Sequence, residues 1–63
     1  MLNDSEQAAT FALEHPGWEA WRSLKGRQWH ARMVGAVPPV MVHDDTMLGL
    51  CEQVEALKSA GIV

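Results

Sequence analysis

The chain has 63 residues, of which 48% are hydrophobic, and its formal net charge is −3 at pH 7. This length fits one small domain over residues 1–63, and the apolar fraction excludes an intrinsically disordered chain. A single cysteine, Cys51, excludes an internal disulfide, and no run of 18 apolar residues is present to cross a membrane. A lone thiol fits a reducing compartment, and the first residues lack the pattern of a secretory signal, so we expect a cytoplasmic protein without membrane contact.

The first predicted element is a helix from Asp4 to Glu14. Asp4 is a residue type that caps helices, and Gln7, three positions later, completes a capping-box pattern. The helix should end before Pro16, because the residue before a proline is pushed out of the helical region. Apolar side chains at helical spacing form a narrow stripe that consists of Ala8, Phe11, Ala12 and His15.

Two tryptophan-bearing runs, residues 18–23 and 27–34, follow this helix. They are joined by a short link that contains Gly26, a pattern that predicts a β-hairpin. The second run alternates between apolar and polar side chains, as expected of a half-buried strand. Its apolar side consists of Trp29, Ala31 and Met33.

The register of this hairpin has two solutions, which place different tryptophans in the core. In the first, the loop has two residues, so that Arg22 lies opposite Trp29 and Trp18 joins the core. This register also brings Glu19 opposite Arg32, but an exposed ion pair contributes little to stability.

In the second register, Ser23 begins a type I turn, and Gly26 closes it in the left-handed region of backbone conformation. Serine at the first position and glycine at the fourth are typical of this turn. We therefore predict the second register, with Trp21 directly opposite Trp29 on the covered face of the sheet.

Residues 35–39 form a connector, because Pro38 and Pro39 cannot donate hydrogen bonds to a sheet. Residues 40–43 then predict a short third strand that is covered on at least one face. A final helix is expected after Asp44, Asp45 and Thr46, with an acidic cap, and it should stop at Gly61. Its apolar stripe consists of Met47, Leu50, Cys51, Val54 and Leu57.

The predicted fold class is therefore α+β. The element order is a helix, a three-stranded antiparallel sheet and a second helix (αβββα), with both helices on one face of the sheet.

Residues that could support catalysis or bind metal are few. The chain has three histidines, His15, His30 and His43, and one cysteine, but no closely spaced ligand pair of the zinc type. The segment from His43 to Asp45 could hold a divalent ion, but a strand end followed by a helix cap explains the same residues. Cys51 lies in an apolar stripe, where a thiol behaves as a small hydrophobe. We expect no enzyme, and no catalytic, cofactor or metal site.

Charge is distributed unevenly along the chain. Residues 17–34 hold four cations and one carboxylate, whereas the remainder holds one cation and seven carboxylates. The basic, aromatic hairpin is therefore the candidate partner-binding surface, and it consists of Trp18, Arg22, Lys25, Arg27, His30 and Arg32.

Such a surface could stack bases and contact phosphates, so nucleic-acid binding is the alternative function. The element order is also that of double-stranded RNA-binding domains. Those domains present a lysine-rich start of the last helix, whereas this chain presents Asp44 and Asp45, and its overall acidity opposes binding to phosphates.

The hairpin carries the pattern WxxWRSxxGRxW at residues 18–29. This pattern resembles one found in small uncharacterised actinobacterial proteins, and the resemblance covers roughly residues 15–57. It implies no activity and no site. It does imply that Trp21, Gly26 and Trp29 belong to the framework of the hairpin.

Together these features lead us to expect a small regulatory or adaptor protein that acts through protein–protein contacts as a homodimer. A domain of this size buries little surface on folding, and small domains commonly gain stability by self-association. Here the contact would form through an open sheet face or an edge strand. In a two-fold contact, the basic hairpin of one copy could meet acidic residues of the other copy, which are Asp44, Asp45, Glu52 and Glu55. Salt should weaken such a dimer, because it screens the attraction between exposed charges.

Overall fold

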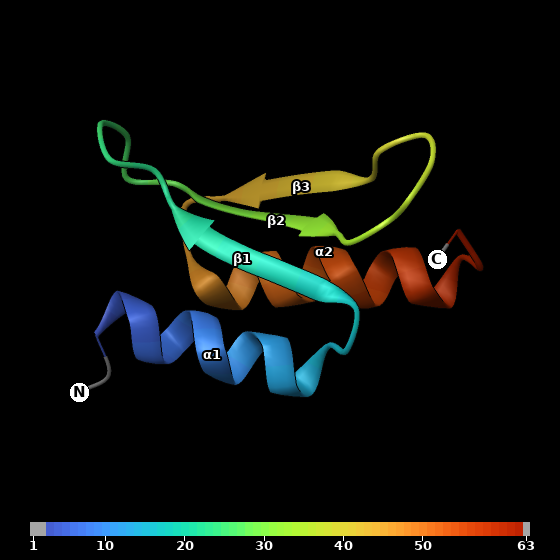
Figure 1. Cartoon of the computed structure of the whole chain (residues 1–63), viewed down its shortest axis with the longest axis horizontal. Coiled ribbons are helices and arrows are strands. Elements are labelled where there is room, and N and C mark those ends of the chain that lie inside the picture. The colour runs from blue at the N-terminus through green and yellow to red at the C-terminus, as the bar shows by residue number, and fades with distance from the viewer. Residues whose placement is uncertain (1–2, 63) are drawn as a thin grey trace.

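Three antiparallel strands form one sheet, and two helices lie on the same face of it (Figure 1). The structure is a computed structural model that describes residues 3–62. The elements follow in the order α1 (Asp4–Glu14), β1 (Trp18–Arg22), β2 (Trp29–Met33), β3 (Met41–Asp44) and α2 (Met47–Ser59). The strands are arranged in the order β1-β2-β3, and both pairs are antiparallel. The predicted αβββα fold is confirmed.

The core lies between the sheet and the helices. Helix α1 packs on β1, and α2 packs on β2 and β3. Ala31 in the central strand is fully buried, and its small side chain lets the helical layer approach the middle of the sheet closely. The buried hydrophobic residues come from both helices and two strands, and they are Phe11, Trp18, Trp29, Ala31, Leu50 and Val54.

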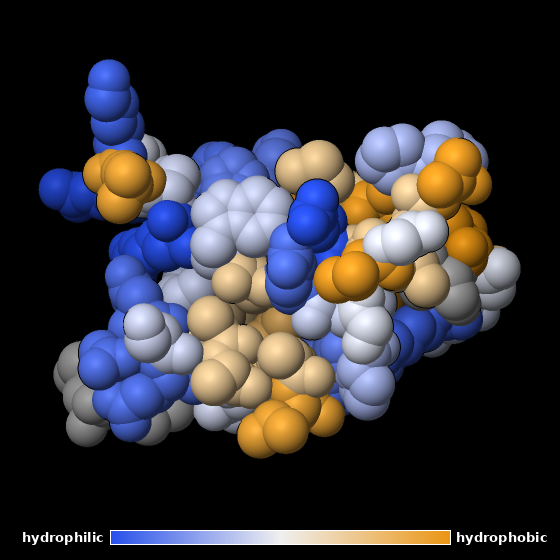
Figure 2. Space-filling view, in the orientation of Figure 1, coloured by the Kyte–Doolittle hydropathy of each residue, from blue (hydrophilic) through white to orange (hydrophobic). Residues whose placement is uncertain are grey.

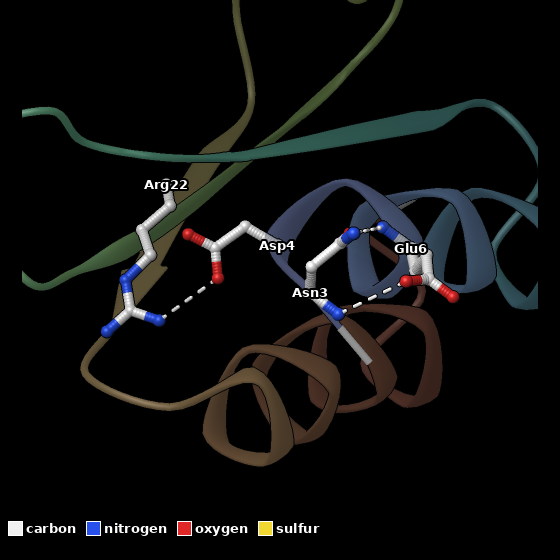
Figure 3. A network of polar contacts seen from close by, with 4 residues as sticks. All are labelled: Asn3, Asp4, Glu6 and Arg22. Atoms are coloured by element: carbon white, nitrogen blue, oxygen red, sulfur yellow. Dashed lines mark hydrogen bonds and ion pairs between the residues drawn. The ribbon is translucent and has the colours of Figure 1, made fainter. Parts of the chain in front are cut away.

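Helix α1 has the predicted bounds but a different cap. Asn3 is the N-cap, and its side chain accepts a hydrogen bond from the Glu6 backbone N–H at 2.8 Å. Glu6 reciprocates by accepting from the Asn3 N–H at 3.4 Å, which completes a capping box (Figure 3). The capping box therefore lies one residue earlier than the predicted box of Asp4 and Gln7. The Asp4 carboxylate does not cap the helix and instead contacts Arg22 of the sheet.

The hairpin adopts the register that we did not predict. Trp29 lies opposite Arg22, not opposite Trp21. Trp18 consequently points into the core, where it is 4% exposed, and Trp21 lies on the other face, where it is 37% exposed. The prediction that Trp21 lies opposite Trp29 on the covered face is wrong, and Trp18, which we placed on the partner-binding surface, lies in the core.

The Glu19 carboxylate gives the physical reason for this register. Side chains alternate between faces along a strand, so Glu19 shares a face with Trp21, and Ala20 shares the other face with Trp18. Burying Trp21 would also bury the Glu19 carboxylate, and a buried charge without a partner is costly. In the observed register, Glu19 lies opposite Arg32 and accepts a hydrogen bond from Arg32 Nε.

The hairpin loop also differs from the predicted turn. The Ser23 N–H donates to the Gln28 carbonyl oxygen at 3.0 Å and closes a loop over residues 24–27. Gly26 does not adopt the predicted left-handed conformation. The glycines that have a positive φ are Gly17, Gly35 and Gly61. A Cβ at Gly26 would lie 2.7 Å from Ser23 Oγ, so the close approach of this hydroxyl favours glycine here.

Truncation of the two tryptophans distinguishes the two registers. Trp18→Ala removes a buried indole and should destabilise the fold by about 3–5 kcal/mol, enough to unfold much of so small a domain. Trp21→Ala removes a half-exposed side chain and should cost on the order of 1 kcal/mol. Urea denaturation followed by circular dichroism measures both losses. A greater loss for Trp21→Ala than for Trp18→Ala would contradict the observed register.

Candidate functional site

The sheet face that the helices leave uncovered is the candidate functional site (Figure 1). Residues that pair across strands lie on the same face, so the register defines which side chains are found there. We call them the open-face residues, and they are Glu19 and Trp21 of β1, His30 and Arg32 of β2, and Met41 and His43 of β3.

Three aromatic rings form a row across the open face, one from each strand. Trp21 and His30 are stacked, with ring centroids 5.6 Å apart and an angle of 14° between the planes. His30 and His43 meet edge to face, with centroids 6.0 Å apart and an angle of 66°. The row follows from the register, which places His30 opposite both Trp21 and His43. Such ring pairs contribute about 0.5–1.5 kcal/mol each beyond the burial of their area.

A second row on the same face combines charge and apolar surface. Arg32 pairs with Glu19 through Nε and Oε1, so this part of the face carries two opposite charges that compensate one another. Met41 lies opposite Arg32 on β3 and is 57% exposed. The open face is thus partly aromatic and close to neutral in charge, and not strongly basic.

The structure brings together only two of the six predicted partner-binding residues, His30 and Arg32, on the open face. Lys25 and Arg27 are exposed in the hairpin loop, outside the open face. Figure 2 shows that mostly hydrophilic side chains gather at this end of the molecule, whereas hydrophobic side chains gather at the other end, over the β2–β3 loop. The predicted basic surface is therefore divided between a face and a loop.

Arg22 belongs to the covered face and joins α1 to the hairpin. Its Nη1 lies 3.4 Å from Oδ1 of Asp4, in the first turn of α1 (Figure 3). Its guanidinium carbon also lies 5.7 Å from the centroid of the Trp29 ring, in a cation–π contact. Arg22, which we expected on a partner-binding surface, thus makes an ion pair and a cation–π contact within the chain.

The junction between β3 and α2 holds His43 in place. Gln53 Nε2 donates to the His43 carbonyl oxygen at 2.6 Å and to Asp44 Oδ2 at 3.1 Å. Asp44 Oδ1 accepts from the Thr46 N–H at 3.1 Å, and Thr46 is the N-cap of α2, accepting from Gly49 N–H at 3.0 Å. The cap is thus Thr46, and Asp44 orders the turn before it.

Asp45 has a separate role in this junction. Its Oδ1 accepts a hydrogen bond from Gln28 Nε2 at 3.1 Å, which connects the start of α2 to the strand side of the hairpin loop. Both aspartates of the predicted acidic cap are therefore engaged in hydrogen bonds within the chain.

A groove of about 190 Å³ lies between the two helices, and Cys51 lines it. Partial burial raises the pKa of the Cys51 thiol, and the carboxylates of Glu14 and Glu55 raise this pKa further. A nucleophilic cysteine needs the opposite shift, because the thiolate is the reactive form. The groove therefore places the chain's one thiol in surroundings that suppress its reactivity.

His15 has polar partners that the sequence pattern did not reveal. It is 5% exposed, and its Nδ1 lies 3.0 Å from Lys58 Nζ and 3.4 Å from Glu55 Oε1. These contacts join the end of α1 to the end of α2. The spacing of Glu55 and Lys58, three residues apart on α2, is the one signal that could have indicated a charged pair at this position.

No known protein family, curated protein or solved structure matches this chain. Across residues 3–62, no helix is long and apolar enough to span a bilayer. Over the same residues, no group of three or more histidine, cysteine, aspartate or glutamate side chains is arranged to hold a metal ion. Function is therefore inferred from the geometry of the open face.

The lowered pKa of Asp44 predicts a pH effect of defined sign. The Thr46 N–H is the main cause, and it holds the pKa of this carboxyl below its ordinary value of 3.8. The stability that Asp44 contributes is therefore present above that pH, and it is lost as the pH falls through the pKa of the folded state. Asp44→Asn should lower the urea midpoint at neutral pH, and its difference from the unaltered protein should shrink in acid. A difference that stays constant with pH would contradict this assignment.

The raised pKa of Cys51 predicts slow modification of the folded protein. A chromogenic disulfide reagent at neutral pH should react with the native thiol roughly tenfold or more slowly than with the thiol in denaturant, because less thiolate forms and access is reduced. Equal rates in the two states would show that the groove does not protect Cys51.

Proposed function

We propose that this protein is a small, non-enzymatic adaptor or regulatory module of the cytoplasm that binds another protein through the open face of its sheet. The observation that carries the proposal is the half-exposed Trp21, stacked in a row of rings on a face that neither helix covers. Tryptophan and methionine are enriched at protein interfaces, and the exposed Met41 lies on the same face.

The charge of the hairpin favours a protein partner over a nucleic acid. Arg22 is paired with Asp4, and Arg32 is paired with Glu19. Among the cations of the hairpin, this leaves Lys25 and Arg27, for which the described part of the chain offers no ion pair. Binding to phosphates gains its strength from several cations acting together, so two loop residues supply little. The stacked rings still support the alternative, a nucleic-acid-binding accessory protein, because bases stack on such platforms.

A second copy of the chain is the first partner to test. Two open faces can cover one another in a two-fold contact, which buries Trp21 and Met41 of both copies. Glu19 and Arg32 are already paired within each chain, so such a contact would depend on aromatic burial more than on charge. This homodimer would therefore be less sensitive to salt than the charge-based dimer expected from the sequence.

Sedimentation velocity over a range of protein concentrations tests the homodimer. Trp21→Ala should weaken self-association by about tenfold or more, as expected for a tryptophan at the centre of an interface. Leu24→Ala is the matched control, because Leu24 is a fully exposed hydrophobic residue in the hairpin loop, outside the open face. A chain that stays monomeric at all concentrations would refute the homodimer.

Affinity capture with the unaltered protein and with Trp21→Ala tests the wider proposal. A protein partner that resists nuclease treatment and is lost with Trp21→Ala is the result expected. Recovery that depends on nucleic acid, and that is lost with the double variant Lys25→Ala and Arg27→Ala, would replace the proposal with its alternative. A partner retained equally by Trp21→Ala would move the binding surface away from the open face.

A further inference from the structure

His30 and His43 lie directly opposite one another on adjacent strands. Three positions along the same ladder, the Met33 N–H donates to the Val40 carbonyl oxygen at 3.0 Å, which marks that pair as hydrogen-bonded. Hydrogen-bonded and non-hydrogen-bonded pairs alternate along an antiparallel ladder, so the histidines occupy a non-hydrogen-bonded pair. Side chains are closest in such pairs, where the Cα atoms are about 4.5 Å apart.

The rings of these two histidines lie close together on the open face of the sheet. Their centroids are 6.0 Å apart, and both side chains leave the same uncovered face. Trp21 stacks on the face of the His30 ring, so this contact involves the ring face and not its edge. His43 is exposed, so its ring can turn toward His30 without displacing the core.

We propose that His30 and His43 form a two-histidine site for a divalent transition-metal ion such as Zn²⁺ or Cu²⁺. Imidazole nitrogen is a preferred ligand of both ions, with a bond of about 2.0–2.1 Å to zinc. The two rings occupy two coordination positions, and water from the open face occupies the others. The site is complete within one chain, so it does not depend on the proposed adaptor function.

This site differs from the one that the sequence suggests around His43. Asp44 projects to the opposite face of the sheet, where it accepts hydrogen bonds from Thr46 and Gln53. It is therefore not available to an ion held in front of the open face. His30 and His43 are thirteen residues apart in the sequence, and only the pairing of β2 with β3 brings them together.

Nuclear magnetic resonance of the unaltered protein, titrated with zinc chloride, tests the site directly. The imidazole signals of His30 and His43 should shift together and saturate at one ion per chain, whereas those of the buried His15 should stay in place. Copper(II) chloride should quench the emission of Trp21, because this indole stacks on His30. Shifts confined to His15, shifts of only one of the two histidines, or no shifts at all would overturn the proposal.

Calorimetric titration of variants provides the second measurement. His43→Phe and His30→Phe each keep an aromatic ring in the row and remove the ligating nitrogens. Each should weaken zinc binding by at least about tenfold, because the loss of even an outer-shell partner of a metal site costs 10–100-fold. Cys51→Ala is the control, since it removes the chain's one thiol, and it should bind zinc as the unaltered protein does. Equal affinity in His43→Phe, or a loss of affinity in Cys51→Ala, would refute the two-histidine site.

Discussion

The structure depends on one constraint, which is that Trp18 and Trp29 must share the covered face of the hairpin. Each is almost fully buried against the helices. Since side chains alternate along a strand, this shared burial also decides the opposite face, and it sends Glu19, Trp21 and His30 outward together. The aromatic row, the exposed ion pair and the histidine pair are all consequences of the same register.

Much of the fold could be predicted, because it is encoded by short-range patterns. The bounds of α1, the position of α2, the three strands and their order follow from helical periodicity, strand alternation and the placement of prolines. The predicted stripe of α2 also holds, since Leu50 and Val54 are buried and Met47, Cys51 and Leu57 pack against the core. The caps are predicted wrongly, as the shift from Asp4 to Asn3 shows, because neighbouring polar residues compete for the same N–H groups.

The candidate site could be predicted only in part, because it depends on contacts between distant residues. Local turn preferences at Ser23 and Gly26 favour one register, and the burial of the Glu19 carboxylate opposes it. The cost of burying this carboxylate outweighs the turn preferences, and the hairpin adopts the register that exposes it. In the same way, nothing near Arg22 in the sequence indicates that its charge is taken up by Asp4, eighteen residues earlier. The pairing of Glu19 with Arg32 across the two strands is the sequence feature that favours the correct register.

The order of the strands in space is also their order along the chain, and this has a consequence for folding. Every strand pairs with its neighbour in sequence, and each helix packs on strands that adjoin it in the chain or lie one strand further on. The loops that must close are short, so the entropic barrier is low, and topologies of this kind fold faster than those built from distant pairings. The contact of His15 with Lys58, in contrast, joins residues that are 43 positions apart in the chain. A contact between residues this far apart closes a long loop, so it depends on the sheet to hold both helices in place.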